Sequence, residues 1–265
     1  MKKILIFNCL FIIFLSCKEK EIKNNNKISE SEHLIMSVVW FQKSAELKAI
    51  FYQTYAMAKM SLEKNISESK SKKKKAVVLD LDETVLDNSP FEAKCIETGK
   101  SFNSKSWKEW VDLSKAEILP GAKDFLFFAK EKNVEVFYIS NRKHRDLEAT
   151  IKNLKKYDLP NADKEHVFLR DGKNTTKKSR RNKVKENFEI ILLIGDNLGD
   201  FSEIYENRNE KLAFDIVEKN KNDFGKKFIV LPNPMYGEWE NAIYGNKKLS
   251  NDEKKLIRKN VLISY

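Results

Sequence analysis

A short apolar run that ends in two carboxylates constrains the fold of this chain more than any other stretch. Residues 76–79 read Ala-Val-Val-Leu, and Asp80 and Asp82 follow them. A short run rich in β-branched residues predicts a buried strand rather than a helix. Carboxylates two residues apart on an extended chain point to the same side. At the end of a buried parallel strand that side opens on the ligand-binding crevice, where two like charges need a compensating cation or a phosphate-handling role.

Further apolar runs, which predict strands, alternate with stretches that predict helices. The other predicted strands cover residues 134–139, 167–169, 190–194 and 228–231. Helices are predicted at residues 122–132, 145–157 and 177–187, with shorter helical stretches at 201–205 and 214–222. Strands that alternate with helices are typical of β-α-β units, whose parallel sheet carries helices on both faces. We therefore predict an α/β fold with a Rossmann-like parallel sheet and a smaller helical cap or decoration.

The first thirty residues are expected to lie outside the fold. Residues 1–16 combine a basic start with an apolar core, which predicts a secretory signal too short to span a bilayer. A small residue directly before Cys17 resembles a bacterial lipoprotein signal, so Cys17 is the expected site of lipidation and would anchor the chain to a membrane. An ordinary signal peptide with an incidental cysteine is the alternative. Residues 17–30 are polar and predict a tether.

Residues 31–265 are expected to form one domain with a core and three additions. Residues 31–66 predict a helical region, as one long helix or two consecutive ones. The α/β core is expected at residues 76–89 and 121–235, and closing helices at 236–265. The insertion at 90–120 is rich in aromatic residues, which indicates a small cap with its own core or a wall that faces the substrate.

Charge and cysteine content exclude several classes of protein. The formal net charge is +11, and loss of Lys2 and Lys3 with the signal leaves +9. This charge is compatible with anionic substrates or acidic surfaces, and a lysine-rich, solvated surface is the alternative. Basic and acidic residues are interleaved without a clustered basic helix, so no nucleic-acid partner is expected. Cys95 alone remains for the folded part, which excludes a disulfide framework. The three histidines share no ligand spacing, so a zinc site is not expected.

Polar side chains follow three of the predicted strands, and in a parallel sheet these ends share one edge. They are Asp80 with Asp82, Ser140 with Asn141 and Arg142, and Asp196 with Asp200. Carboxylates without histidine or cysteine select a hard cation such as Mg²⁺. Ser140 offers a donor for an anion, and Lys177 or Lys178 could neutralise a phosphate oxygen. This combination indicates phosphoryl transfer, with one carboxylate as nucleophile and a second, two residues on, as proton donor and acceptor.

Five motifs in order resemble one family. Residues 80–84, Asp-Leu-Asp-Glu-Thr, resemble the first motif of the haloacid dehalogenase superfamily, and residues 196–200 resemble its acidic last motif. The residues of these motifs are similar to those of the class C acid phosphatases of the lipoprotein e family. That similarity also covers Trp-x-Gln-x-Ser-Ala-Glu at 40–46, Ser-Asn-Arg at 140–142 and Leu-Pro-Asn-x-x-Tyr-Gly at 231–237. The resemblance spans about residues 35 to 245 and implies a haloacid dehalogenase core.

The resemblance implies a role for each polar residue of the predicted edge. Asp80 would be the nucleophile and Asp82 the general acid and base. Mg²⁺ would be held by the Asp80 carboxylate, the Asp82 main-chain oxygen and Asp196, with Asp200 orienting water. Phosphate would be bound by three side chains: Ser140, Asn141 and Lys177, for which the adjacent Lys178 is the alternative.

The resemblance also implies the substrate. Members cleave phosphate monoesters, among them nucleoside 5′-monophosphates, and stack the base on aromatic residues. Phe91, Trp107 and Tyr236 stand at such positions, and ordinary packing is the alternative for Trp107 and Tyr236. We expect an Mg²⁺-dependent acid phosphatase, lipid-anchored in the bacterial cell envelope and outside the cytoplasm. A surface lipoprotein that binds haem or a host molecule, and a phosphotransferase, are the alternatives; a homodimer is left open.

Overall fold

The described part of this computed structural model comprises residues 30–173, 175–206, 208 and 212–265. The predicted signal and nearly all of the predicted tether, with Cys17, lie outside the described residues. No helix within the described ranges is both long and apolar enough to cross a membrane.

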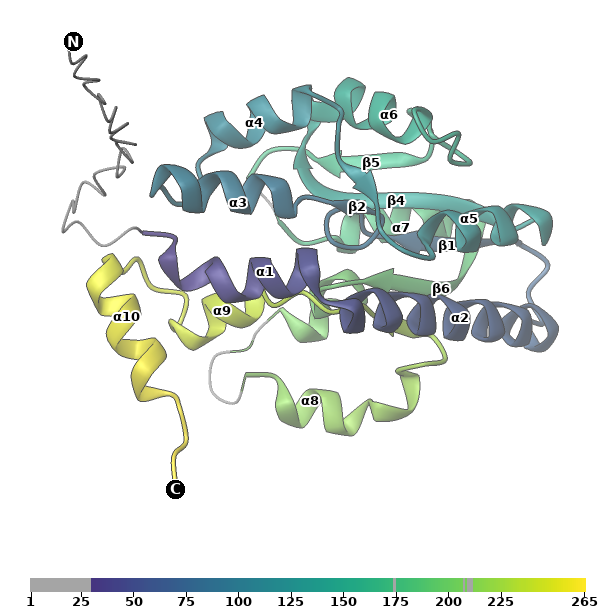
Figure 1. The fold of residues 1–265 in the computed structure, drawn as a ribbon. Helices are drawn as coiled ribbons and strands as arrows, with labels where there is room; N and C mark the ends of the chain where they lie inside the picture. The colour runs from purple at the N-terminus through teal and green to yellow at the C-terminus, as the bar shows by residue number, and fades with distance from the viewer. Residues whose placement is uncertain (1–29, 174, 207, 209–211) are drawn as a thin grey trace, which may run out of the picture.

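A five-stranded parallel sheet forms the centre of the molecule, with the strand order β5-β4-β1-β6-β7 (Figure 1). The strands are β1 (Lys74–Leu79), β4 (Glu135–Lys143), β5 (Val167–Arg170), β6 (Phe188–Gly195) and β7 (Phe228–Val230). The chain moves outward from β1 through β4 to β5, and then crosses to the other side of β1 for β6 and β7. The topological switch point, where such sheets bind ligands, therefore lies between β1 and β6.

Alternation along β1 explains why helices cover both faces of the sheet. Val77 and Leu79 join one apolar core, whereas Ala76 and Val78 join the other. The first core contains buried residues of α2 (Ala45–Glu68), α5 (Ala122–Glu131) and α6 (Leu147–Lys155). The second includes residues of α7 (Lys178–Asn187) and α8 (Phe214–Lys219). The predicted α/β fold with a parallel sheet is thereby confirmed.

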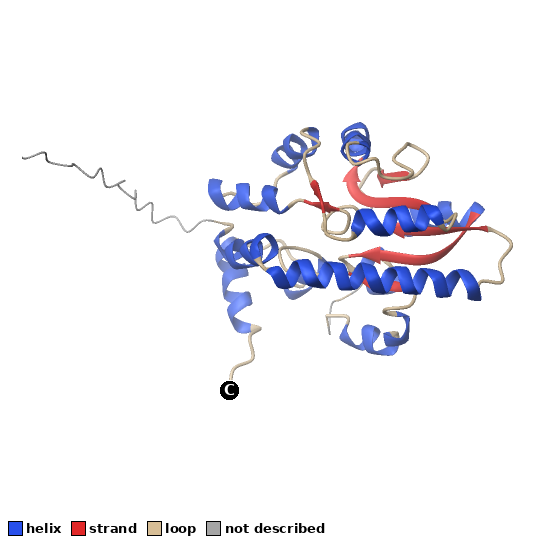
Figure 2. Cartoon of the chain, turned by 45° about the vertical axis from the view of Figure 1, so that its right-hand side comes forward, coloured by secondary structure: helices blue, strands red, loops and turns tan. Residues whose placement is uncertain are grey.

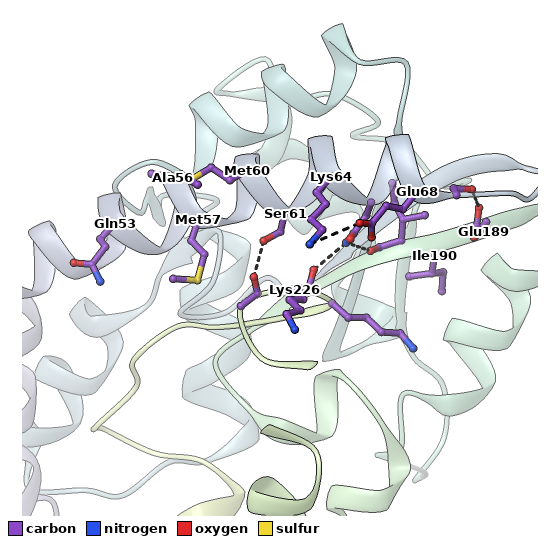
Figure 3. A pocket seen from close by; sticks show the side chains of 15 residues that line it. Gln53, Ala56, Met57, Met60, Ser61, Lys64, Glu68, Glu189, Ile190 and Lys226 are labelled. Atoms are coloured by element: carbon purple, nitrogen blue, oxygen red, sulfur yellow. Dashed lines mark hydrogen bonds and ion pairs between the residues drawn. The ribbon is translucent and has the colours of Figure 1, made fainter. Parts of the chain in front are cut away.

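The N-terminal helical region consists of two consecutive helices, α1 (Ile35–Lys43) and α2. They separate at Ser44, whose backbone is extended and whose hydroxyl accepts the N–H of Leu47 as an N-cap. Helix α2 is tied to the sheet near its end: Ser61 donates to the carbonyl of Gly225 (2.7 Å), and Asn65 to that of Ile191 (2.8 Å). Figure 3 shows the groove of about 900 Å³ beside these contacts, which adjoins the start of β6 and not the carboxyl end of the sheet.

The insertion after β1 is a small helical cap. A two-stranded antiparallel pair, β2 (Leu86–Asp87) with β3 (Glu117–Ile118), closes it at its base. Between these strands lie α3 (Ser89–Thr98) and α4 (Ser104–Asp112). The closing helices α9 (Glu238–Ile243) and α10 (Asn251–Asn260) lie toward the same end of the molecule as α3 (Figures 1 and 2). Short 3₁₀ helices occupy Glu32–Leu34, His144–Asp146, Leu198–Asp200, Glu203–Tyr205 and Lys221–Asp223.

Several boundaries differ from the sequence-based expectation, and two of the differences lie beside the carboxyl end of the sheet. Strand β4 continues past Ile139 to Lys143, because a register shift after Ser140 lets the pairing with β5 resume at Lys143. The expected helical stretch at 201–205 is a single 3₁₀ turn, Glu203–Tyr205, which Ser202 caps by accepting the N–H of Ile204.

Candidate active site

The carboxylates predicted at the ends of β1 and β6 do meet. Asp80 follows β1 and donates its N–H to the carbonyl of Ile194 in β6 (2.9 Å). One carboxylate oxygen from each of Asp80, Asp196 and Asp200 lies within 4.8 Å of the others. Asp80 and Asp200 are buried, and Asp196 is half-buried. The switch point of the sheet therefore carries a compact acidic cluster at the floor of a cavity of about 670 Å³.

Hydrogen bonds within the protein interior hold the turn after β1 in place. The carbonyl of Leu81 accepts the N–H groups of Val85 (2.9 Å) and Leu86 (2.8 Å). From the neighbouring helix α2, the buried Tyr55 hydroxyl donates to the carbonyl of Thr84 (2.7 Å). These bonds satisfy backbone groups that would otherwise be buried without partners, and they fix the loop that carries Asp80.

The turn after β6 depends on a glycine. A Cβ atom on Gly195 would lie 2.2 Å from Oδ2 of Asp200, far inside contact distance. That oxygen accepts the N–H of Asn197 (3.0 Å), and the Asn197 side chain accepts the N–H of Gly199 (3.2 Å). The missing side chain at 195 therefore lets Asp200 fold back against the strand end and face Asp80.

Lys177 supplies the positive charge of the cluster. It immediately precedes α7, is 5% exposed, and its Nζ pairs with Oδ1 of Asp80 and with Oδ1 of Asp200 (2.7 Å). The adjacent Lys178 instead pairs with Glu203 at the surface (2.8 Å). Of the two lysines left open by the sequence, the structure places Lys177 among the carboxylates.

The charges of this cluster do not balance. Burial raises the pKa of Asp80 to about 7, against the opposing effect of Lys177. Burial also raises the pKa of Asp196 well above its usual value, and the charge of Asp200 adds to that rise. If all three carboxylates were ionised, they would exceed the single ammonium by two negative charges. A divalent cation would neutralise them, and a donor set of oxygens alone suits a hard ion such as Mg²⁺.

The carboxylate of Asp82 is turned to a separate set of partners. Its Oδ1 accepts Nε (2.9 Å) and Nη2 (2.8 Å) of Arg142 and the amide of Asn88 (2.9 Å). Its Oδ2 accepts the hydroxyl of Ser140 (3.0 Å). The buried Arg142 thus balances Asp82, and Trp110 of α4 extends the network by donating to Asn88 (2.8 Å).

Ser140 and Asn141 lie on the bulge of β4, beside this network. Ser140 is fully buried, and its hydroxyl accepts the N–H of Arg142 (3.1 Å) while it donates to Asp82. Asn141 lines the cavity, and its Oδ1 accepts Nη2 of Arg180 (2.6 Å). Two of the three predicted phosphate-binding residues, Ser140 and Asn141, therefore lie close to the acidic cluster, but Ser140 is engaged with Asp82.

Aromatic side chains of the cap form one wall of the cavity. Phe102 and Trp107 line it, and Tyr236, which follows β7, lines it as well. Phe91 differs from the expectation, because it is 3% exposed and packs edge-on beneath Trp107, with ring centres 5.0 Å apart. Phe102, which is 60% exposed, reaches the cavity in its place. Phe91 therefore supports the wall rather than forming its surface.

Several contacts of the site were not assigned from the sequence. Asn233 donates to Oδ2 of Asp196 (2.8 Å), and Asn88 and Arg142 bracket Asp82. Arg142 and Asn233 belong to the motifs Ser-Asn-Arg and Leu-Pro-Asn-x-x-Tyr-Gly, and Asn88 follows the first motif by four residues, so a sequence signal was present but did not identify their partners. For Trp110 and Arg180 the sequence offers no comparable signal.

Comparisons with known proteins agree with this geometry. The family described as HAD superfamily, subfamily IIIB (Acid phosphatase) matches residues 12–239. The chain is similar to the structure of the class C acid phosphatase from Bacillus anthracis, with a TM-score of 0.85 and 42% sequence identity over 90% of this chain and 100% of that chain. A structure of that phosphatase with tungstate bound gives a TM-score of 0.84 and 44% identity, over 89% of this chain and 98% of that chain.

Proposed function

The chain belongs to the acid phosphatases of subfamily IIIB in the HAD superfamily, and we propose that it hydrolyses nucleoside 5′-monophosphates through an aspartyl-phosphate on Asp80. It is thus a phosphomonoesterase, as its motifs predicted. One observation carries the proposal: the cluster of Asp80, Lys177, Asp196 and Asp200 and the aromatic wall belong to one cavity. The tungstate in a relative's structure supports an oxyanion site, since tungstate has the tetrahedral shape of phosphate.

The two aspartates of the first motif have different roles in the reaction. An oxygen of Asp80 attacks phosphorus, the bond from phosphorus to the ester oxygen breaks, and Asp82, which first takes up a proton from solvent, gives that proton to the leaving alkoxide. Asp82 then takes a proton from water, which attacks the phosphoryl group and releases phosphate and Asp80. Lys177 offsets the repulsion between Asp80 and the anionic phosphate.

A divalent cation fits the excess negative charge of the cluster, and we propose Mg²⁺. It would be held by Asp80, Asp196 and Asp200, with the main-chain oxygen of Asp82. When bound, it would neutralise charge on the phosphate oxygens.

The nucleotide proposal rests on the aromatic wall of the cavity that the acidic cluster also lines. A base can stack on Trp107, Phe102 or Tyr236, and such stacking contributes ~1–3 kcal/mol per base. A phosphate ester without a ring would leave these side chains unused. The wall therefore favours substrates with a planar leaving group.

The test is a substrate panel with excess Mg²⁺ and with a chelator. Trp107→Ala and Tyr236→Ala are each expected to lower kcat/KM for adenosine 5′-monophosphate roughly tenfold, and to change it for glycerol phosphate less than about twofold. Phe214→Ala is the control, because Phe214 is 70% exposed on α8 and does not line the cavity. Equal losses on both esters would contradict stacking, and full turnover in chelator would contradict the metal.

We also propose that the protein is lipid-anchored through Cys17 in the cell envelope, outside the cytoplasm. The support is the signal-like sequence at residues 1–17 alone. Membrane fractionation of the full chain should find Cys17→Ser released from the membrane fraction; unchanged retention would contradict the anchor.

A further inference from the structure

We propose that the active-site cavity contains a second anion-binding subsite, centred on Arg170, which takes a second phosphate group of the same substrate. The inference rests on the proposed function in one respect: the phosphate that is cleaved lies at Asp80. It adds a substrate class, bisphosphorylated small molecules. A simple monoester would occupy only one of the two anion sites of the cavity.

Side chains alternate between the two faces of the sheet along β5, and this alternation directs Arg170 into the cavity. Val167 and Leu169 are buried in the core on the α2 side of the sheet. Phe168 and Arg170 alternate with them and face the α7 side, where Phe168 packs against the second core. Arg170 is the last residue of β5 and lines the cavity that also contains Asp80. Its guanidinium is therefore positioned by the sheet rather than by a loop.

Arg170 lacks a partner within the described ranges. Its Nε is buried and makes no hydrogen bond, and no carboxylate lies within ion-pair distance of the guanidinium. Glu206, which lines the same cavity, accepts a hydrogen bond from Thr176 instead. Buried donors without partners are rare because each loses its hydration without replacement. An anion in the cavity would supply the missing acceptor.

Arg180 adds a second positive charge beside Arg170 without a carboxylate of its own. Its donors go to neutral oxygens: the Ser140 carbonyl (2.5 Å), Asn141 Oδ1 (2.6 Å) and the Thr176 carbonyl (3.1 Å). Burial lowers the pKa of Arg180 to about 10, and the charge of Arg170 acts in the same direction. The guanidinium groups of Arg142 and Arg181, in contrast, each pair with a carboxylate.

The sheet sets the spacing between the two anion sites. Strand β5 is two strands away from β1 in the order β5-β4-β1. Neighbouring strands are about 4.8 Å apart, so the ends of β5 and β1 are separated by about 10 Å. A second phosphate that is separated from the first by a sugar ring suits this spacing better than one joined to it directly. Nucleoside 3′,5′-bisphosphates and hexose bisphosphates have this chemistry.

The experiment compares pairs of substrates that differ by one phosphate, in excess Mg²⁺. Adenosine 3′,5′-bisphosphate is compared with adenosine 5′-monophosphate, and a hexose bisphosphate with its monophosphate. Arg170→Gln is expected to lower kcat/KM for each bisphosphate roughly tenfold or more and for each monophosphate less than about twofold. Arg170→Lys should keep part of the preference, because it keeps the charge but loses the fork of donors.

Lys183→Gln is the matched control, since it removes one positive charge from α7 at a residue that stacks on Phe168 and does not line the cavity. Thermal melting reports whether each variant folds. Equal losses on both members of a pair, or the same loss in Lys183→Gln, would overturn the subsite and leave the proposed function intact. Absence of turnover of every monophosphate by the wild type would instead overturn the proposed function.

Discussion

Asp80→Asn is expected to abolish phosphatase activity, by roughly 10⁴-fold or more in kcat. The substitution keeps the shape of the side chain but removes the nucleophilic oxygen that lies beside Lys177. Release of inorganic phosphate measures the loss, and mass spectrometry of acid-quenched protein should detect a phosphoryl adduct in the wild type only. Asp124→Asn, at an exposed aspartate of α5, is the control. Substantial turnover by Asp80→Asn would exclude the covalent route.

The same variant should fold, and its stability should depend less on pH. Burial gives Asp80 a folded pKa of about 7, above the ordinary 3.8, so between these values the native state holds a proton that the unfolded chain has lost. Stability contributed by this group is therefore present below about pH 4 and is lost as pH rises through 7. In metal-free buffer, the melting temperature of Asp80→Asn should fall less over this window than that of the wild type.

Lys177→Met is expected to lower kcat/KM by roughly 10²–10³-fold, because it removes a preorganised positive charge beside the nucleophile. It also leaves the Asp80 and Asp200 carboxylates buried without the ammonium that pairs with both. Loss of one partner of a buried ion pair typically costs about 3–5 kcal/mol of stability. Added Mg²⁺ should restore much of the melting temperature without restoring the rate.

Lys178→Met is the matched control for this prediction. It changes the same residue type one position along the chain, at a lysine that pairs with Glu203 and is 54% exposed. Its effect on kcat/KM should stay below about twofold, since surface pairs contribute little. A larger loss in Lys178→Met than in Lys177→Met would reverse the assignment of the two lysines.

The central strand and its carboxylates were predictable because they depend on short-range sequence signals. An apolar run followed by Asp80 and Asp82 specifies a buried strand end, and the alternation of strands and helices specifies a parallel sheet. Parallel strands bring their carboxyl ends to one edge, so the meeting of Asp80 with Asp196 and Asp200 followed from topology. The acid phosphatase family followed from motifs within these same loops.

Which residues each side chain of the site contacts was less predictable from the sequence. Successive residues near a helix start differ by about 100° around the axis, so whether Lys177 or Lys178 faces the cluster depends on where α7 begins and how it docks. In the cap, the packing of α3 against α4 decides that Phe91 is covered and Phe102 reaches the cavity. No local pattern contains that information.

The sequence by itself determined the sheet, the edge where its polar ends meet and the chemistry of those ends, because local periodicity and strand direction suffice for them. Only the tertiary structure decided how the charges are distributed. It joins Lys177 to two carboxylates, balances Asp82 with Arg142, and leaves the buried Nε of Arg170 without a hydrogen-bond partner among the described residues. Two of these pairings join residues that are 60 and 97 positions apart, Arg142 with Asp82 and Lys177 with Asp80. Contacts over such separations exist only once the sheet and its helices have packed.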